Sequence, residues 1–220
     1  MAEGIGTALL LTAVVGSGIM GEHLAAGNTA LALLANSVAT GAALVALILT
    51  FGPVSGAHFN PVVTLTAALR GQAPWNSVGP YVLAQLVGGL AGVMLAHAMF
   101  AEPHLLAAST QVRSGGAQWL SESVATCGLL TVILSCSRHR PNDTPLAVGL
   151  YIAGAYWFTA STSFANPAVT LARTLTPTFA GIRPADAPAF IVAQAAGTVA
   201  AIGLCHWLLP EAGHPSKDLQ

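Results

Sequence analysis

The chain contains one short apolar pattern twice, and this duplication constrains its fold more than any other feature. Residues 60–65 read NPVVTL, and residues 166–171 read NPAVTL. A Glu-x-x-x-Thr pattern precedes each copy, at residues 3–7 and again at residues 122–126. Two landmarks that recur in the same order indicate an internal repeat.

A third landmark supports the same conclusion. The pattern Ala-Gln-x-x-Gly occurs at residues 84–88 and at residues 193–197, after each Asn-Pro copy. We therefore divide the chain into a first repeat of about residues 1–100, a second of about 117–209, and a short C-terminal tail, 210–220. We expect both repeats to belong to a single transmembrane domain, residues 1–220.

Composition places this duplicated domain in a membrane. The 220 residues are 54% hydrophobic and 7% charged, whereas about 25% of the residues of a soluble domain are charged. Six apolar stretches approach the roughly 20 residues that a spanning helix needs. They lie at about 4–21, 30–51, 78–100, 117–136, 145–162 and 186–209. The predicted fold class is therefore an all-α membrane protein with six transmembrane helices.

The two Asn-Pro pairs predict short helices that enter the membrane without crossing it. Each repeat has three spans, so the second repeat enters from the opposite side, which gives an inverted repeat. Asn60-Pro61 and Asn166-Pro167 follow the second span of each repeat, and Asn is a favoured N-cap before a Pro at the first helical position. We expect two half-helices whose N-termini meet near the middle of the membrane.

Such an arrangement favours small, neutral, polar solutes. Two helix N-termini repel cations, and two Asn side chains offer hydrogen-bond donors. The irregular segments that precede the half-helices are expected to present a ladder of carbonyl acceptors. The residues of this ladder are Gly56, Ala57, His58, Thr162, Ser163 and Phe164.

Two glutamates at the starts of spans have no obvious counter-charge. An ionisable group within a membrane span normally faces the interior and has a partner. We expect Glu3 and Glu122, with Gln85 and Gln194, to hold the re-entrant loops by accepting hydrogen bonds from loop N–H groups. The alternative is that each glutamate lies at the membrane surface.

These residues together resemble the aquaporin superfamily, also called major intrinsic proteins. The resemblance rests on SGAHFNPVVTL, SFANPAVTLA and the paired motifs above, and it covers nearly the whole chain. It implies a homotetramer in which each protomer has its own pore. It assigns the central constriction to two Asn-Pro motifs, formed by Asn60, Pro61, Val62, Asn166, Pro167 and Ala168.

The resemblance also implies an outer selectivity filter. Counting from the Asn-Pro pairs gives four filter positions, Thr40, Gly154, Ser163 and Val169. Most family members have arginine at the last position, so a valine predicts a wider filter without a fixed charge. The nearest arginine, Arg173, lies one turn further on. We expect it to face the vestibule or to cap its helix as Arg70 does, rather than to reach the filter.

A filter formed by small residues, together with Asn-Pro-Ala-Val-Thr as the second motif, resembles a bacterial subgroup of aquaglyceroporins associated with arsenic resistance. The resemblance implies passive transport of arsenite, related metalloid hydroxides and methylated arsenicals, and also of glycerol and water. The alternatives are a general water and glycerol channel, an ion-coupled carrier that uses Glu3 and Glu122, and an intramembrane hydrolase that uses Ser55 and His58.

The remaining predictions concern partners and location. The net charge of −1, without a basic run, argues against nucleic-acid binding. Three cysteines without ligand spacing predict no metal site, and no cofactor is expected. The short loop Arg138-His139-Arg140 favours a cytoplasmic N-terminus, because cytoplasmic loops of membrane proteins are enriched in basic residues. We therefore expect a multi-pass protein of the inner membrane, in contact with the lipid bilayer, with cytoplasmic N- and C-termini.

Overall fold

The computed structural model describes residues 1–209, so the predicted tail 210–220, with the C-terminus, lies outside the described residues. This part of the chain is helical and contains no strand. The α-helices are α1 (Ala2–Leu24), α2 (Thr29–Ser55), α3 (Pro61–Leu69), α4 (Trp75–Met99), α5 (Gly116–His139), α6 (Thr144–Phe158), α7 (Pro167–Arg173) and α8 (Ala187–Leu208). Short 3-10 turns, η1 (Pro141–Asp143) and η2 (Pro184–Asp186), precede α6 and α8.

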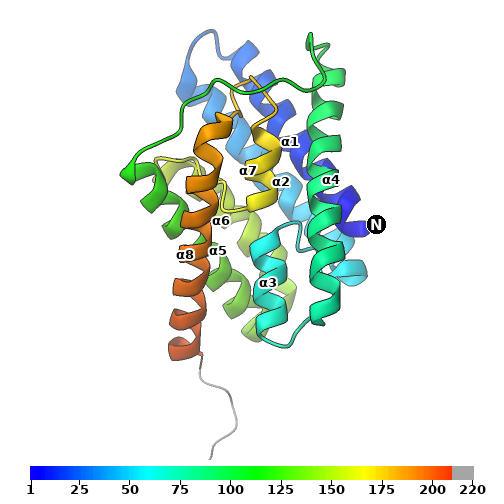
Figure 1. Ribbon diagram of the computed structural model, residues 1–220, viewed down its shortest axis with the longest axis vertical. Helices are drawn as coiled ribbons and strands as arrows, with labels where there is room; N and C mark the ends of the chain where they lie inside the picture. The colour runs from blue at the N-terminus through cyan, green and yellow to red at the C-terminus, as the bar shows by residue number, and fades with distance from the viewer. Residues whose placement is uncertain (210–220) are drawn as a thin grey trace, which may run out of the picture.

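The helices form a bundle whose two halves have matching contacts (Figure 1). Helix α1 packs on α4 and α2 in the first half, as α5 packs on α8 and α6 in the second. Gly88 lies against the backbone of Gly4, and the equivalent Gly197 lies against the backbone of Ser123. A side chain at either glycine would overlap a carbonyl oxygen, so close crossing requires glycine at both places.

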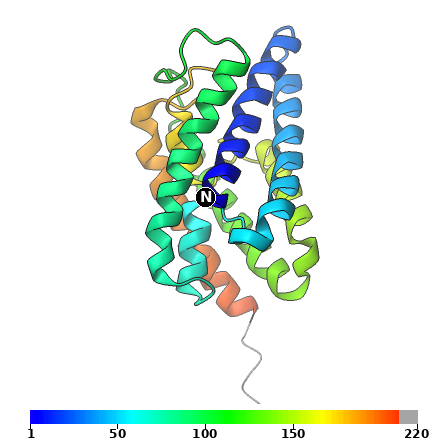
Figure 2. The same ribbon diagram turned by 90° about the vertical axis from the view of Figure 1, so that its right-hand side faces the viewer.

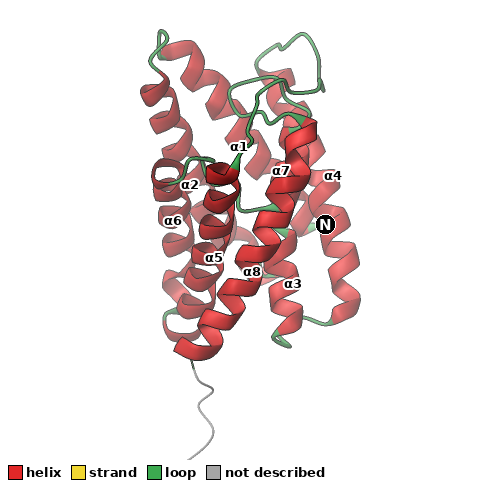
Figure 3. Ribbon diagram, turned by 60° about the vertical axis from the view of Figure 1, so that its left-hand side comes forward, coloured by secondary structure: helices red, strands yellow, loops and turns green. Residues whose placement is uncertain are grey.

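The half-helices α3 and α7 lie one above the other along the length of the bundle (Figures 1 and 3). Each begins with Pro at its first position. The Asn60 side chain accepts a hydrogen bond from the N–H of Val62 at 3.1 Å, and Asn166 caps α7 in the same way. Local sequence therefore starts both half-helices where the Asn-Pro pairs predict them.

Five of the six predicted spans have the length and hydropathy of a membrane-crossing helix, namely α1, α2, α4, α5 and the segment Pro184–Leu208 that contains α8. The remaining predicted span, 145–162, the fifth along the chain, is longer than the helix that forms there. Helix α6 has 15 residues and ends at Phe158. The reason is tertiary: beyond it, Ala160 donates its N–H to the Ser121 hydroxyl at 3.0 Å and accepts from the Gln118 amide at 3.0 Å.

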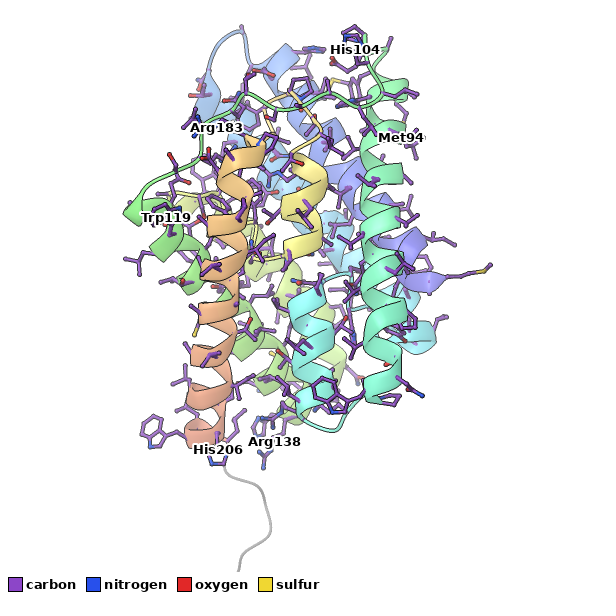
Figure 4. All side chains as sticks on the ribbon, viewed as in Figure 1. Met94, His104, Trp119, Arg138, Arg183 and His206 are labelled. Atoms are coloured by element: carbon purple, nitrogen blue, oxygen red, sulfur yellow. The ribbon has the colours of Figure 1, made fainter. Side chains whose placement is uncertain are left out.

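The first helix begins about half-way along the bundle, not at one end (Figure 2). The end of the bundle with Arg138 and His206 lies opposite the end with His104 and Arg183 (Figure 4). We call the first of these the inner end and the second the outer end. The start of α1 lies between these two ends (Figure 2).

Candidate functional site

A cavity of about 210 Å³ lies between the two repeats and extends toward the inner end. Both half-helices present residues three and seven positions after their Asn to this cavity: Val63 and Ala67 from α3, and Val169 and Arg173 from α7. Residues four apart share one face of a helix. The opposite wall is apolar, with Leu44, Ile48, Leu129, Ile133, Val148 and Ile152.

The two Asn side chains meet at the middle of the cavity. Asn60 donates through Nδ2 to the carbonyl of Ala165 at 2.8 Å, and Asn166 donates through Nδ2 to the carbonyl of Phe59 at 2.8 Å. Each amide nitrogen carries two N–H groups. Since each makes one hydrogen bond within residues 1–209 and both residues line the cavity, one N–H of each remains for a solute.

Glu3 holds the first re-entrant loop from within the bundle. Its carboxylate accepts hydrogen bonds from the N–H groups of His58 and Phe59, at 3.0 and 2.7 Å, and from the amide of Gln85 at 2.8 Å. A fourth donor is the hydroxyl of Ser55 at 2.7 Å. Glu3 is only 3% exposed, so it does not lie at the bundle surface.

Glu122 does the same for the second loop. Its carboxylate accepts from the N–H groups of Phe164 and Ala165, at 2.8 and 2.9 Å, and from the amide of Gln194 at 2.7 Å. The buried position and loop partners are those expected for both glutamates. Charge-assisted hydrogen bonds to backbone N–H groups are among the stronger ones in proteins.

Sequence reasoning missed one member of each network. The hydroxyl of Thr64 accepts from the Gln85 amide at 3.0 Å, and Thr170 accepts from Gln194 at 2.9 Å. Each threonine also donates to the carbonyl of the Asn four residues earlier, Asn60 at 3.1 Å or Asn166 at 2.8 Å. The signal was present, because the fifth residue of both hexapeptides is threonine.

The carbonyls of the expected ladder have no donor within residues 1–209. Five of the six residues line the cavity, Gly56, Ala57, His58, Ser163 and Phe164, and Thr162 does not. The backbone is left-handed at Gly56, Ala57 and Phe59 in the first loop and at Thr162, Ser163 and Ala165 in the second, so neither loop forms a helix or a strand. The loops therefore carry unused acceptors beside the Asn donors.

Three of the four expected filter residues line the cavity, namely Thr40, Ser163 and Val169. The fourth prediction, Gly154, is wrong: this glycine is exposed on the outer side of α6, and a Cβ there would meet nothing within 4 Å. Helix α6 turns Ile152 and Tyr156 toward the cavity instead, and a residue between them faces away. The Tyr156 hydroxyl lies 3.3 Å from that of Thr40, so this part of the wall does contain an aromatic ring.

Arg173, expected to face the vestibule or to cap its helix, lies in the cavity wall. Its side chain is 2% exposed, lines the cavity and lies over the ring of Phe164, with Cζ 3.4 Å from the ring centre. Its Nε donates to the carbonyl of Ala180. Arg70 is not the counterpart of Arg173. The equivalent position in α3 is Ala67, and Arg70 lies three residues later, as the C-cap of α3. The cavity wall therefore has a fixed positive charge although Val169 has none.

A second arginine, which sequence reasoning did not select, approaches Phe164 from the loop between α4 and α5. Arg113 has its Cζ 5.2 Å from the centre of the Phe164 ring. It donates to the carbonyls of Gly181, Ser161 and Phe179 at 2.8, 3.3 and 3.4 Å. Burial lowers the pKa of the Arg113 guanidinium, which nevertheless stays protonated at neutral pH.

Ser55 and His58 do not form the pair that a hydrolase needs. The Ser55 hydroxyl donates to Glu3, and the His58 ring contacts the hydroxyl of Thr64 at 3.1 Å through Nδ1. A nucleophilic serine requires a base within hydrogen-bond reach. These two residues therefore support the loop.

Comparison with known proteins decides the family. The sequence profile described as "Major intrinsic protein" matches residues 1–163, which is more than half of the chain. The chain belongs to the major intrinsic protein family. Proteins of this fold and ancestry are channels and not enzymes, which agrees with the geometry of Ser55 and His58.

Several members of the family are similar to this chain. Aquaglyceroporin AqpS of Rhizobium meliloti (strain 1021) is 55% identical over 212 residues, which cover 96% of this chain and 90% of that protein. Aquaporin NIP1-4 of Oryza sativa subsp. japonica is 31% identical over 169 residues, 74% of this chain and 61% of that protein. The X-ray structure of the aquaglyceroporin from Plasmodium falciparum has the same fold, with a TM-score of 0.71 and 20% identity, covering 94% of this chain and 92% of that one.

Proposed function

We propose that this protein is a passive channel for small uncharged solutes with several hydroxyl groups: arsenous acid and related metalloid hydroxides, including methylated arsenicals, as well as glycerol and water. The observation that carries the proposal is the pair Asn60 and Asn166. Each offers one free N–H beside loop carbonyls that have no donor among the described residues. The similar protein of Rhizobium meliloti is named an aquaglyceroporin.

The wall supports solutes that have a polar and an apolar side. Donors and acceptors from the loops face apolar side chains of α2, α5 and α6 across the same cavity. A triol or a trihydroxide exchanges water for these groups one hydrogen bond at a time, which is how a narrow polar pore selects neutral molecules. Arsenous acid is uncharged at neutral pH and offers three hydroxyls, as glycerol does.

An ion-coupled carrier is the alternative. It requires a carboxylate that takes up and releases a proton or an ion during transport. Glu3 and Glu122 are the candidates, but both carboxylates are occupied by loop N–H groups and glutamine amides, and neither lines the cavity. This geometry favours a structural role for both glutamates and a channel mechanism.

The proposal includes a homotetramer in the inner membrane with cytoplasmic N- and C-termini. Large apolar side chains are exposed around the bundle, among them Leu83, Val87, Val192 and Val199, and they need lipid or another protomer to cover them. The short connection from α5 to α6, at the inner end, contains Arg138, His139 and Arg140. A short basic loop supports a cytoplasmic location for this end.

Flux into proteoliposomes tests the proposal. Water, glycerol and arsenite permeabilities are measured by stopped-flow light scattering and isotope uptake for the wild type, Val169→Arg and Val169→Leu. We expect Val169→Arg to reduce glycerol and arsenite flux more than water flux, because it adds a bulky cation to the wall. Val169→Leu controls for size alone.

Two results would contradict the proposal. Equal reductions for all three solutes in Val169→Arg would remove Val169 from the selectivity argument. Saturable arsenite uptake that needs a proton gradient would support the carrier in place of the channel.

A further inference from the structure

We infer that Arg173, together with Ser163, determines which solutes pass this channel: the guanidinium of Arg173 repels cations, and its amino groups and the Ser163 hydroxyl bind solute hydroxyls. This inference rests on the proposed channel function. It assigns to the wall of the pore a positive charge that the sequence, with valine at position 169, did not predict.

The position of Arg173 is fixed by its helix. It lies four residues after Val169, so both side chains point to the same side of α7, and both line the cavity. Rise along a helix places Arg173 about 6 Å nearer the outer end than Val169. A solute that enters from the outer end therefore meets Arg173 before it meets Asn166.

Arg173 has unused donors. A guanidinium has five N–H groups, and within residues 1–209 only the Nε group makes a hydrogen bond, to Ala180. No carboxylate of the described residues forms an ion pair with it, since the two ion pairs there involve Arg140 and Arg183. A charged side chain inside a membrane protein that has no carboxylate partner and lines a cavity is expected to face a water-filled pathway and to have a functional role.

Ser163 supplies an independent observation on the same cavity. Its hydroxyl is buried, the residue is 3% exposed, and Oγ has no hydrogen-bond partner in the described part of the chain. Buried hydroxyls without a partner are rare. Because Ser163 lines the cavity together with Arg173, the unused hydroxyl is available to a solute oxygen.

Phe164 and Arg113 hold Arg173 in place. The Phe164 ring lies under the Arg173 guanidinium at 3.4 Å from Cζ, which is a cation–π geometry. Arg113 approaches the same ring and fixes the surrounding loops through Gly181, Ser161 and Phe179. Arg113 does not line the cavity, so it is a positioning residue, while Arg173 contacts the solute.

Urea and guanidinium provide the test, because they have the same shape and differ in charge. Their fluxes into proteoliposomes are measured for the wild type, Arg173→Gln, Arg173→Lys and the control Arg140→Gln, whose arginine is exposed at the inner end. We expect Arg173→Gln to raise the ratio of guanidinium to urea flux by about tenfold or more, equivalent to about 1.4 kcal/mol of lost repulsion. Arg173→Lys should keep the low ratio, and Arg140→Gln should not change it.

Ser163→Ala tests the solute-binding part and removes no hydrogen bond between protein groups. We expect the ratio of glycerol to water flux to fall by about threefold, the effect of one neutral hydrogen bond. If Arg173→Gln does not fold, Arg173→Met, which keeps an unbranched side chain and removes the charge, takes its place in the comparison with Arg173→Lys.

Three outcomes separate the two proposals. A folded Arg173→Gln channel with the wild-type guanidinium-to-urea ratio would overturn the charge role of Arg173. An unchanged glycerol-to-water ratio in Ser163→Ala would overturn the solute-binding role. A wild-type protein that passes neither glycerol nor urea would instead refute the channel function itself.

Discussion

Replacing Glu122 by glutamine tests whether a buried carboxylate holds the second re-entrant loop. The substitution keeps the size of the side chain and removes its charge. Glu122 is 0% exposed and accepts three hydrogen bonds, from the N–H groups of Phe164 and Ala165 and from the amide of Gln194. A glutamine has one acceptor oxygen where the carboxylate has two.

The magnitude follows from these three contacts. In Glu122→Gln the remaining oxygen still accepts from Phe164, but the new amino group faces two donors, Ala165 N–H and Gln194 Nε2. Loss of two hydrogen bonds to a charged group costs about 3–6 kcal/mol, at about 1.5–3 kcal/mol each. Gln194 can turn its amide, since its Oε1 is buried without a partner among the described residues, but this breaks its bond to Thr170. We therefore expect Glu122→Gln to lower the free energy of unfolding by about 3 kcal/mol, the lower end of this range.

The assay is thermal unfolding in detergent, with water flux into proteoliposomes as a second measurement. About 3 kcal/mol corresponds to a fall in Tm of about 6–12 °C for a chain of this size, and water flux should fall because the loop that carries Phe164 moves. The control is Glu22→Gln, which changes an exposed glutamate near the end of α1. A Glu122→Gln protein with the wild-type Tm and water flux would refute the assignment.

Three further predictions concern packing, capping and the corrected filter. In Gly92→Val the new side chain would overlap the carbonyl of Ala8, so we expect aggregated protein in size-exclusion chromatography, whereas Gly79→Ala, with open space around Gly79, should elute normally. Asn166→Ala removes two capping bonds and the bond to the opposite loop and should lower stability by at least about 1 kcal/mol, the cost of a lost cap; an unchanged Tm would contradict this. Gly154→Val should leave the glycerol-to-water flux ratio unchanged, and a changed ratio would return Gly154 to the filter.

Much of the architecture was predictable because its signals are local. The Asn-Pro pairs start α3 and α7 through an N-cap and a first-turn proline, both of which act within four residues of sequence. The repeated order of landmarks predicted the inverted repeat. The paired Glu-x-x-x-Thr and Ala-Gln patterns predicted the glutamate and the glutamine that hold each loop. Repetition made these inferences possible, since a contact required in one half is required again in the other.

The outer part of the candidate site was not predictable in the same way. Counting back from Asn166 selected Gly154, but α6 ends at Phe158, and its rotation about its own axis brings Tyr156 to the cavity. Contacts of the following loop with Gln118 and Ser121 of α5 fix this path. They join residues about 40 positions apart, which no local pattern encodes.

The sequence by itself determined the membrane location, the duplicated topology and the starting points of the two half-helices, because hydrophobic length, capping and symmetry depend on near neighbours in the chain. Only the tertiary structure decided that Arg173 is buried over Phe164 and that Arg113 approaches the same ring from a distant loop. The direction of a long side chain depends on the shape and charge of the surroundings that the whole fold builds, and so the charge of the pore wall is a property of the fold.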